Sequence, residues 1–122
     1  MPRKFVESIG NALRWIRFLF RTQRNVVIHF FIGAMAIFLG MALEITLIEM
    51  VVLILVISSV IILEFINTAI EEVVNMLSIH RKMRAMVAKD IAAAAVLVSS
   101  FTAVIVGILI FGPKLTDLIV RF

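Results

Sequence analysis

The sequence contains no cysteine, which excludes disulfide bonds, zinc–thiolate sites and catalysis by a thiol. It also lacks a G-x-x-x-x-G-K-[ST] loop and the Gly-rich loop of soluble kinases, so any nucleotide site would have to be built from helices. Charge is scarce as well, since 16% of the residues are charged and 63% are hydrophobic. A soluble domain of 122 residues could not bury that much apolar surface. The composition therefore predicts an integral membrane protein.

Long apolar segments occupy residues 26–43, 50–77 and 88–112. A membrane-spanning helix needs about 20 predominantly apolar residues, and each segment meets that requirement. The period-two alternation of a transmembrane barrel is absent. We therefore predict one all-α membrane domain over residues 1–122. We expect Pro113, which follows Gly112, to end the third spanning helix.

Residues 4–22 form a segment of a different kind. Apolar side chains recur in it at helical spacing, at Phe5, Ile9, Leu13, Ile16 and Phe20. Polar residues lie largely elsewhere, which predicts an amphipathic helix at the membrane surface with Trp15 as a headgroup anchor. Basic residues run through this region without a short apolar core and a cleavage site, so we do not expect a cleaved signal peptide.

The distribution of basic residues predicts the orientation in the membrane. The first 24 residues are rich in Lys and Arg, and the connection 44–49 has none. The connection 78–90 carries Arg81, Lys82, Arg84 and Lys89. The positive-inside rule therefore places the N-terminus and the connection 78–90 in the cytoplasm. Residues 64–72 then lie in the cytoplasmic half of the second apolar segment.

A polar stripe interrupts the cytoplasmic half of the second apolar segment. At 3.6 residues per turn its members fall within about 100° of arc, and they are Glu64, Asn67, Thr68, Glu71 and Asn75. An ionised carboxylate inside hydrocarbon is costly, so Glu64 marks a candidate functional site. Taken singly, Glu64 could be a protonated packing residue, and Asn67 and Thr68 could join helices through hydrogen bonds.

Polar residues on the neighbouring segments point to phosphoryl transfer. Gln23, Arg24 and Asn25 precede the first apolar segment, and Lys89 and Asp90 open the third, so both groups belong to the same membrane face. Carboxylate and amide oxygens suit Mg²⁺ together with substrate phosphates, and a lysine can neutralise phosphate charge. A carboxylate shielded from water can act as a general base toward an alcohol. These residues predict phosphoryl transfer to a lipid alcohol.

One other interpretation uses Glu64. A small proton-coupled transporter could use Glu64 as its proton carrier, although it would not need the Lys89-Asp90 pair. His29 interrupts the first apolar segment, and we interpret it as a packing residue at the membrane edge.

Residues 64–71, with the sequence E-F-I-N-T-A-I-E, resemble the E-[LIF]-[LIV]-N-[ST]-A-I-E signature of the small bacterial integral-membrane lipid kinases. These are the diacylglycerol kinase and undecaprenol kinase family. Residues 88–96 resemble its A-K-D-x-[AG]-[AS]-[AG]-A-V block, and residues 22–29 resemble its T-E-R-N-x₃-H segment. The resemblance extends over residues 11–115, and the distance between the N-T-A-I-E and A-K-D blocks makes it specific.

The resemblance implies a homotrimer in the bacterial cytoplasmic membrane, with active sites between subunits on the cytoplasmic side. It implies phosphorylation of a lipid alcohol with ATP as co-substrate and Mg²⁺ as cofactor. Glu64 corresponds to the catalytic base and Asn67 to an active-site amide. The metal and nucleotide ligands would be Glu71 and Gln23 for Mg²⁺, and Glu71, Arg24, Lys89 and Asp90 for ATP.

The chain departs from the family pattern at Gln23, where the family has a second metal-binding Glu, and at Asn75, where Asp is common. A neutral amide is a weaker Mg²⁺ ligand than a carboxylate. The site could work with Glu71, water and phosphate oxygens, or the chain could be a paralogue with impaired or no activity. The connection 44–49 and the Pro113-Lys114 tail resemble the undecaprenol branch, so we predict undecaprenol as the acceptor, with diacylglycerol as the alternative.

Overall fold

The computed structural model describes residues 2–77 and 82–122. They form the helices α1 (Pro2–Thr22), α2 (Arg24–Ala42), α3 (Leu47–Asn75) and α4 (Lys82–Arg121). No strand occurs in these two ranges, and α2, α3 and α4 are long and apolar enough to cross a membrane. The prediction of an all-α protein with three candidate spans after an N-terminal helix is confirmed. Arg81, part of the predicted basic connection, lies outside the described residues.

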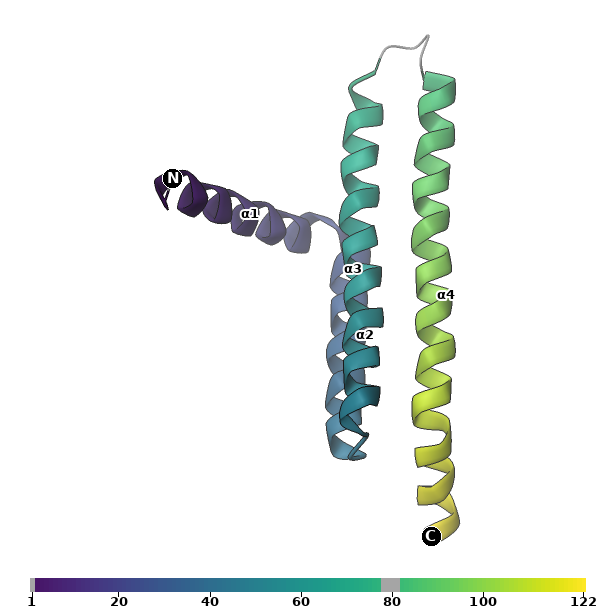
Figure 1. The fold of residues 1–122 in the computed structure, drawn as a ribbon. Helices are drawn as coiled ribbons and strands as arrows, with labels where there is room; N and C mark the ends of the chain where they lie inside the picture. Colours follow the sequence, from purple (N-terminus) through teal and green to yellow (C-terminus); the bar gives the residue numbers. More distant parts are fainter. Residues whose placement is uncertain (1, 78–81) are drawn as a thin grey trace.

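The three long helices lie side by side, and α1 leaves them at a wide angle (Figure 1). α3 contacts α2 along one side and α4 along another. α2, α3 and α4 run antiparallel to one another in turn, and the connected ends of α3 and α4 project beyond the level of α1 (Figure 1). α1 thus meets the bundle at the level where α2 begins, partway along α3.

The corner between α1 and α2 consists of a single residue, Gln23. Its backbone is extended, with φ −104° and ψ 103°, so the chain changes direction there without a loop. The rings of Phe20 in α1 and Phe30 in α2 meet edge to face, with centroids 5.1 Å apart. This contact spans the corner, and such pairs contribute about 0.5–1.5 kcal/mol beyond area burial.

The turn between α2 and α3 is nearly as short. Glu44 adopts a left-handed φ of 54°, and the Ile45 amide donates to the Gly40 carbonyl at 3.1 Å. The Thr46 hydroxyl then accepts from the Glu49 amide, and the Glu49 carboxylate accepts from the Thr46 amide. This capping box satisfies two otherwise unpaired donors and starts α3.

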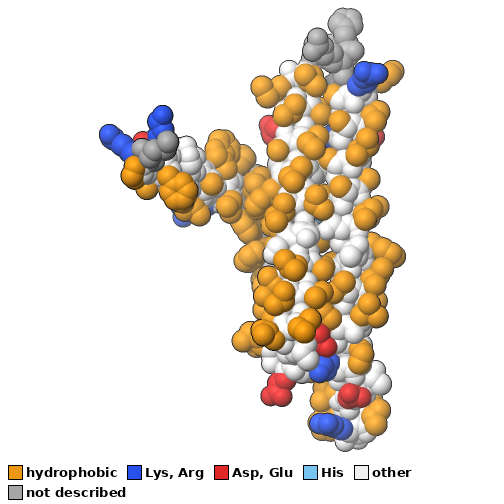
Figure 2. All heavy atoms as spheres, viewed as in Figure 1, with side chains coloured by type: hydrophobic (Ala, Val, Ile, Leu, Met, Phe, Trp, Pro, Cys, Tyr) orange, Lys and Arg blue, Asp and Glu red, His pale blue; other side chains and the backbone are white. Residues whose placement is uncertain are grey.

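Most apolar side chains of the bundle face outward. The buried cluster of Leu53, Ile110 and Phe111 is small, whereas Phe38 is 75% exposed and Leu97 70% exposed. Figure 2 shows hydrophobic side chains along the visible length of the bundle, with charged side chains gathered toward its two ends. So large an exposed apolar surface is untenable for a single chain in water and suits contact with lipid or with other helices.

The predicted end of the third spanning helix at Pro113 is wrong. α4 continues through Pro113 to Arg121, and it begins at Lys82, so it exceeds the predicted range 88–112 at both ends. A proline removes one backbone donor, which leaves only the carbonyl four residues earlier without its usual partner. The turns on either side keep their own hydrogen bonds, and the Thr116 hydroxyl donates to the Gly112 carbonyl at 2.8 Å.

The close approach of α2 to α3 depends on Gly33. A Cβ at this buried position would lie 2.5 Å from Cγ2 of Ile57, a β-branched side chain with little rotamer freedom. We expect Gly33→Ala to destabilise the bundle by about 1–3 kcal/mol, the usual cost of overpacking. Thermal unfolding in detergent would measure it, with Gly112→Ala as the control because a Cβ there meets no atom within 4 Å. Equal melting temperatures for the two variants would contradict the expectation.

Candidate active site

Glu64 lies in the middle of the bundle and has a partner there. Its residue is 6% exposed, and its Oε1 lies 3.4 Å from Nε2 of His29 on α2. Among the described residues this is the only pair of oppositely ionisable side chains within 4 Å. A buried carboxylate is tolerated when a partner offsets the loss of water. The structure therefore pairs the costly acid of α3 with the histidine that interrupts α2.

The His29–Glu64 contact was missed by the sequence analysis, which treated His29 as a packing residue. A signal was present, because His29 is the one ionisable residue within the apolar segment 26–43. An imidazole inside hydrocarbon requires a polar partner just as a carboxylate does. Without the register of α2 against α3, however, the partner could not be named.

Thr68 is buried one turn after Glu64, and its hydroxyl is used locally. It donates to the Glu64 carbonyl at 3.0 Å, within α3 itself. Such back-bonding satisfies a hydroxyl inside an apolar helix. Thr68 thus does not join α3 to another helix through this hydroxyl bond.

Asn67 and Glu71 form the next part of the site. Nδ2 of Asn67 donates to Oε1 of Glu71 at 3.4 Å, and Oδ1 of Asn67 is buried without a partner. Buried acceptors are normally paired, so an unpaired one requires an explanation such as a bound ion or water. Asn67 also lines a cavity of about 300 Å³ between α3 and α4, bounded on α4 by Ala88, Ile91, Ala92 and Ala95.

The register of the helices brings Gln23 and Lys89 to the same level. Gln23 lies six residues before His29, and Glu71 lies seven residues after Glu64, so both stand about 9–11 Å further along the antiparallel helices. Lys89 follows Ala88, which shares the small cavity with Asn67. Gln23, Asn67, Glu71 and Lys89 therefore occupy one layer of the bundle, next to the corner with α1.

The predicted nucleotide-binding residues Lys89, Asp90 and Arg24 differ in how exposed they are. Lys89 is half-buried because it shares the face of α4 that carries the buried Ala85 and Ala92. Asp90 is exposed, since the next residue of a helix points about 100° away. Arg24 is exposed as well. No side-chain hydrogen bond within the described ranges ties Gln23, Arg24, Lys89 or Asp90 to the polar stripe.

The donors of this layer fit a magnesium ion only in part. No group of three or more acidic, His or Cys side chains gathers among the described residues. Mg²⁺, however, is commonly held by one or two carboxylates together with phosphate oxygens and waters. Glu71 supplies one carboxylate, and the unpaired Oδ1 of Asn67 and the amide of Gln23 supply neutral oxygens. Gln23 begins α2 as its N-cap, but its side chain makes no capping bond.

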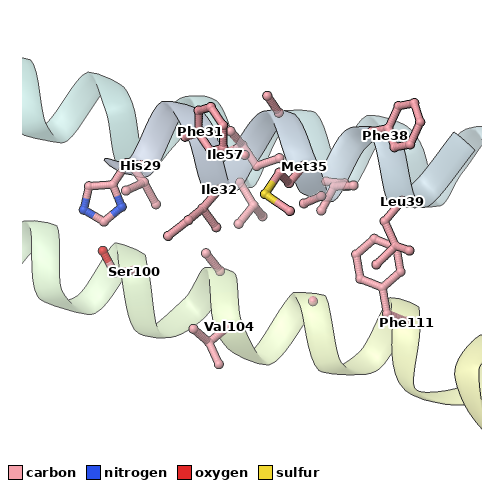
Figure 3. A pocket seen from close by; sticks show the side chains of 18 of the residues that line it. His29, Phe31, Ile32, Met35, Phe38, Leu39, Ile57, Ser100, Val104 and Phe111 are labelled. Carbon is pink, nitrogen blue, oxygen red and sulfur yellow. The ribbon is translucent and has the colours of Figure 1, made fainter. Parts of the chain in front are cut away.

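A larger cavity of about 780 Å³ lies between α2, α3 and α4, on the other side of the His29–Glu64 pair from Gln23. Figure 3 shows His29 and Ser100 at one end of this cavity and Phe38, Leu39 and Phe111 toward the other. Its lining between these ends is almost entirely apolar. Gly107 widens it, because this residue carries no side chain and a Cβ there would meet no atom within 4 Å. The cavity could accept a long apolar chain whose polar end lies near His29.

Comparisons with known proteins agree with the motifs and the fold. A family model described as prokaryotic diacylglycerol kinase matches residues 10–111. The undecaprenol kinase of Bacillus subtilis is 37% identical over 112 residues, which cover 92% of this chain and 91% of that protein. The diacylglycerol kinase of Synechocystis sp. is 42% identical over 116 residues, covering 93% of this chain and 65% of that protein. No solved structure matches the chain. The chain therefore belongs to the prokaryotic diacylglycerol kinase family and is a lipid kinase.

Proposed function

We propose that this kinase phosphorylates undecaprenol with ATP and Mg²⁺ at the cytoplasmic face of a bacterial membrane. The observation that carries the proposal is the position of Glu64, a buried carboxylate beside the polar end of a long apolar cavity. The isoprenoid chain would lie in the cavity, and its single hydroxyl would then reach the His29–Glu64 pair. Holding a hydroxyl beside a base raises the reaction rate, because the reacting groups no longer have to meet and align by diffusion.

Glu64 acts in this proposal as the general base. It takes the proton of the lipid hydroxyl while the hydroxyl oxygen bonds to the γ-phosphorus of ATP. The bond from that phosphorus to the bridging β–γ oxygen breaks, and ADP leaves. Asn67 lies about one helical turn beyond Glu64, in the layer of Glu71, and its unpaired Oδ1 would be available where the two substrates meet.

The phosphate end of ATP would occupy the layer of Gln23, Glu71 and Lys89. Lys89 lies on the face of α4 that packs against α3, where it can balance phosphate charge, and Arg24 and Asp90 would contact the more exposed part of the nucleotide. Glu71 and Gln23 would hold Mg²⁺, which when bound neutralises charge on the transferring phosphoryl group.

Undecaprenol is favoured over diacylglycerol for two reasons. The relative whose match covers most of both chains is named an undecaprenol kinase, whereas the relative named a diacylglycerol kinase extends well beyond the match. The cavity is also one elongated space, which suits one chain better than two. We further propose a homotrimer, because the outward apolar side chains of the bundle offer surfaces for association.

The direct test is the purified protein with Mg²⁺–ATP and either undecaprenol or diacylglycerol. We expect faster phosphorylation of undecaprenol and a loss of about 10²–10⁴-fold in kcat for Glu64→Gln, the usual contribution of a general base. Glu72→Gln serves as the matched control, because Glu72 is exposed on the same helix. Absence of phosphorylation of both lipids, or full activity of Glu64→Gln, would contradict the proposal.

The neutral amide of Gln23 predicts a weak magnesium site. Gln23→Glu would add a second carboxylate, and we expect it to lower the Mg²⁺ concentration for half-maximal activity by on the order of tenfold. Asn25→Asp adds the same charge two residues away and controls for a general electrostatic effect. Equal Mg²⁺ dependence of the Gln23→Glu variant and the unmodified protein would show that position 23 does not contact the metal.

The large cavity is tested by filling it. A Cβ on Gly107 meets no atom within 4 Å, so the side chain of Gly107→Leu would extend into the cavity without displacing the helices. We expect the KM for undecaprenol to rise several-fold while the KM for ATP stays the same. Gly112→Leu, on the same helix but outside the cavity lining, provides the control. An unchanged KM for the lipid would exclude this cavity as its site.

A further inference from the structure

We propose that His29 is the positioning residue of the catalytic base, holding the Glu64 carboxylate where a lipid hydroxyl arrives. This inference rests on the proposed role of Glu64. The pair joins Nε2 of His29 to Oε1 of Glu64 at 3.4 Å across the interface between α2 and α3. No hydrogen bond or ion pair within the described helices engages Oε2 of Glu64, which leaves that oxygen for the hydroxyl.

Among the described residues around Glu64, His29 is the one that can hold the carboxylate in place. The Glu64 side chain is 7% exposed, so water offers it little competition, and the only bond from Thr68 is to the backbone carbonyl of Glu64. A glutamate has three rotatable side-chain bonds. In the absence of a partner, its carboxylate would sample several directions within the bundle. Contact with one polar side chain from another helix restricts it to one of them.

His29 also stands at the entrance from the large cavity to the base. It is 28% exposed, it lines the end of the cavity, and it is the only ionisable residue in that lining (Figure 3). The only other polar side chain of the lining is Ser100 on α4. An alcohol chain lying in the cavity would therefore meet the His29 imidazole and the Glu64 carboxylate together.

A residue that only packs and a residue that positions Glu64 would tolerate different substitutions. Position 29 lies in an apolar segment, so a packing residue would be replaced better by Leu than by Gln. A positioning residue would be replaced better by Gln, whose side-chain amide can still donate to Oε1. The order of activity of these two variants thus separates the two roles.

The experiment measures phosphorylation of undecaprenol by the full-length protein and its His29→Leu and His29→Gln variants. We expect His29→Leu to lower kcat by about 10- to 100-fold, the effect of a misplaced catalytic group, with little change in the KM for ATP. His29→Gln should retain most of the rate. Ser59→Ala is the matched control for loss of a polar group, since the exposed Ser59 donates only to the Leu55 carbonyl of its own helix. Where His29→Leu does not assemble, His29→Met gives the same comparison with a flexible side chain.

A second measurement tests whether His29 acts through Glu64. In the Glu64→Gln background, His29→Leu should cause no further loss, because the group that it positions is already absent. A further drop there, or a Leu variant at least as active as the Gln variant, would overturn the proposal. The outcome is distinguishable from failure of the proposed function. An active Glu64→Gln variant would show that Glu64 is not the base. An inactive Glu64→Gln variant together with a fully active His29→Leu variant would overturn only the role of His29.

Discussion

The contact between Glu64 and His29 is the interaction on which the rest of the site depends. Each of these side chains would be costly alone inside an apolar bundle, and together they satisfy each other across α2 and α3. The pair also constrains the register of α2 against α3, because sliding one helix by one turn would move the two side chains about 5 Å apart. Gln23 and Glu71 reach a common layer as a consequence of that register.

The remainder of the bundle is held by few buried side chains, and its outer faces are apolar almost throughout. Such a structure depends on its surroundings, since lipid or neighbouring helices must cover what the chain does not bury itself. Small residues then determine how closely the helices approach. Gly33 permits contact of α2 with Ile57, and the missing side chain of Gly107 leaves room in the apolar cavity beside the site.

Much of this could be predicted from the residues. Hydropathy placed the three spans, and helical spacing grouped Glu64, Asn67 and Glu71 on one face. The end at Pro113 was predicted wrongly, because a proline inside a helix removes one hydrogen bond and the outcome depends on the flanking turns. The roles of Gln23, Arg24, Lys89 and Asp90 stay predictions, as the structure shows their level and exposure but no bond from them to the stripe.

The sequence by itself determined the helical membrane class, the family and the face of α3 that carries the acids, because these follow from composition, motifs and the helical period. Only the tertiary structure decided which side chain partners Glu64, that Thr68 bonds to its own helix, and that Oδ1 of Asn67 is left unpaired. It alone also revealed the apolar cavity ending at His29. These features arise between helices, and the register and closeness of two helices depend on side chains far apart in the chain.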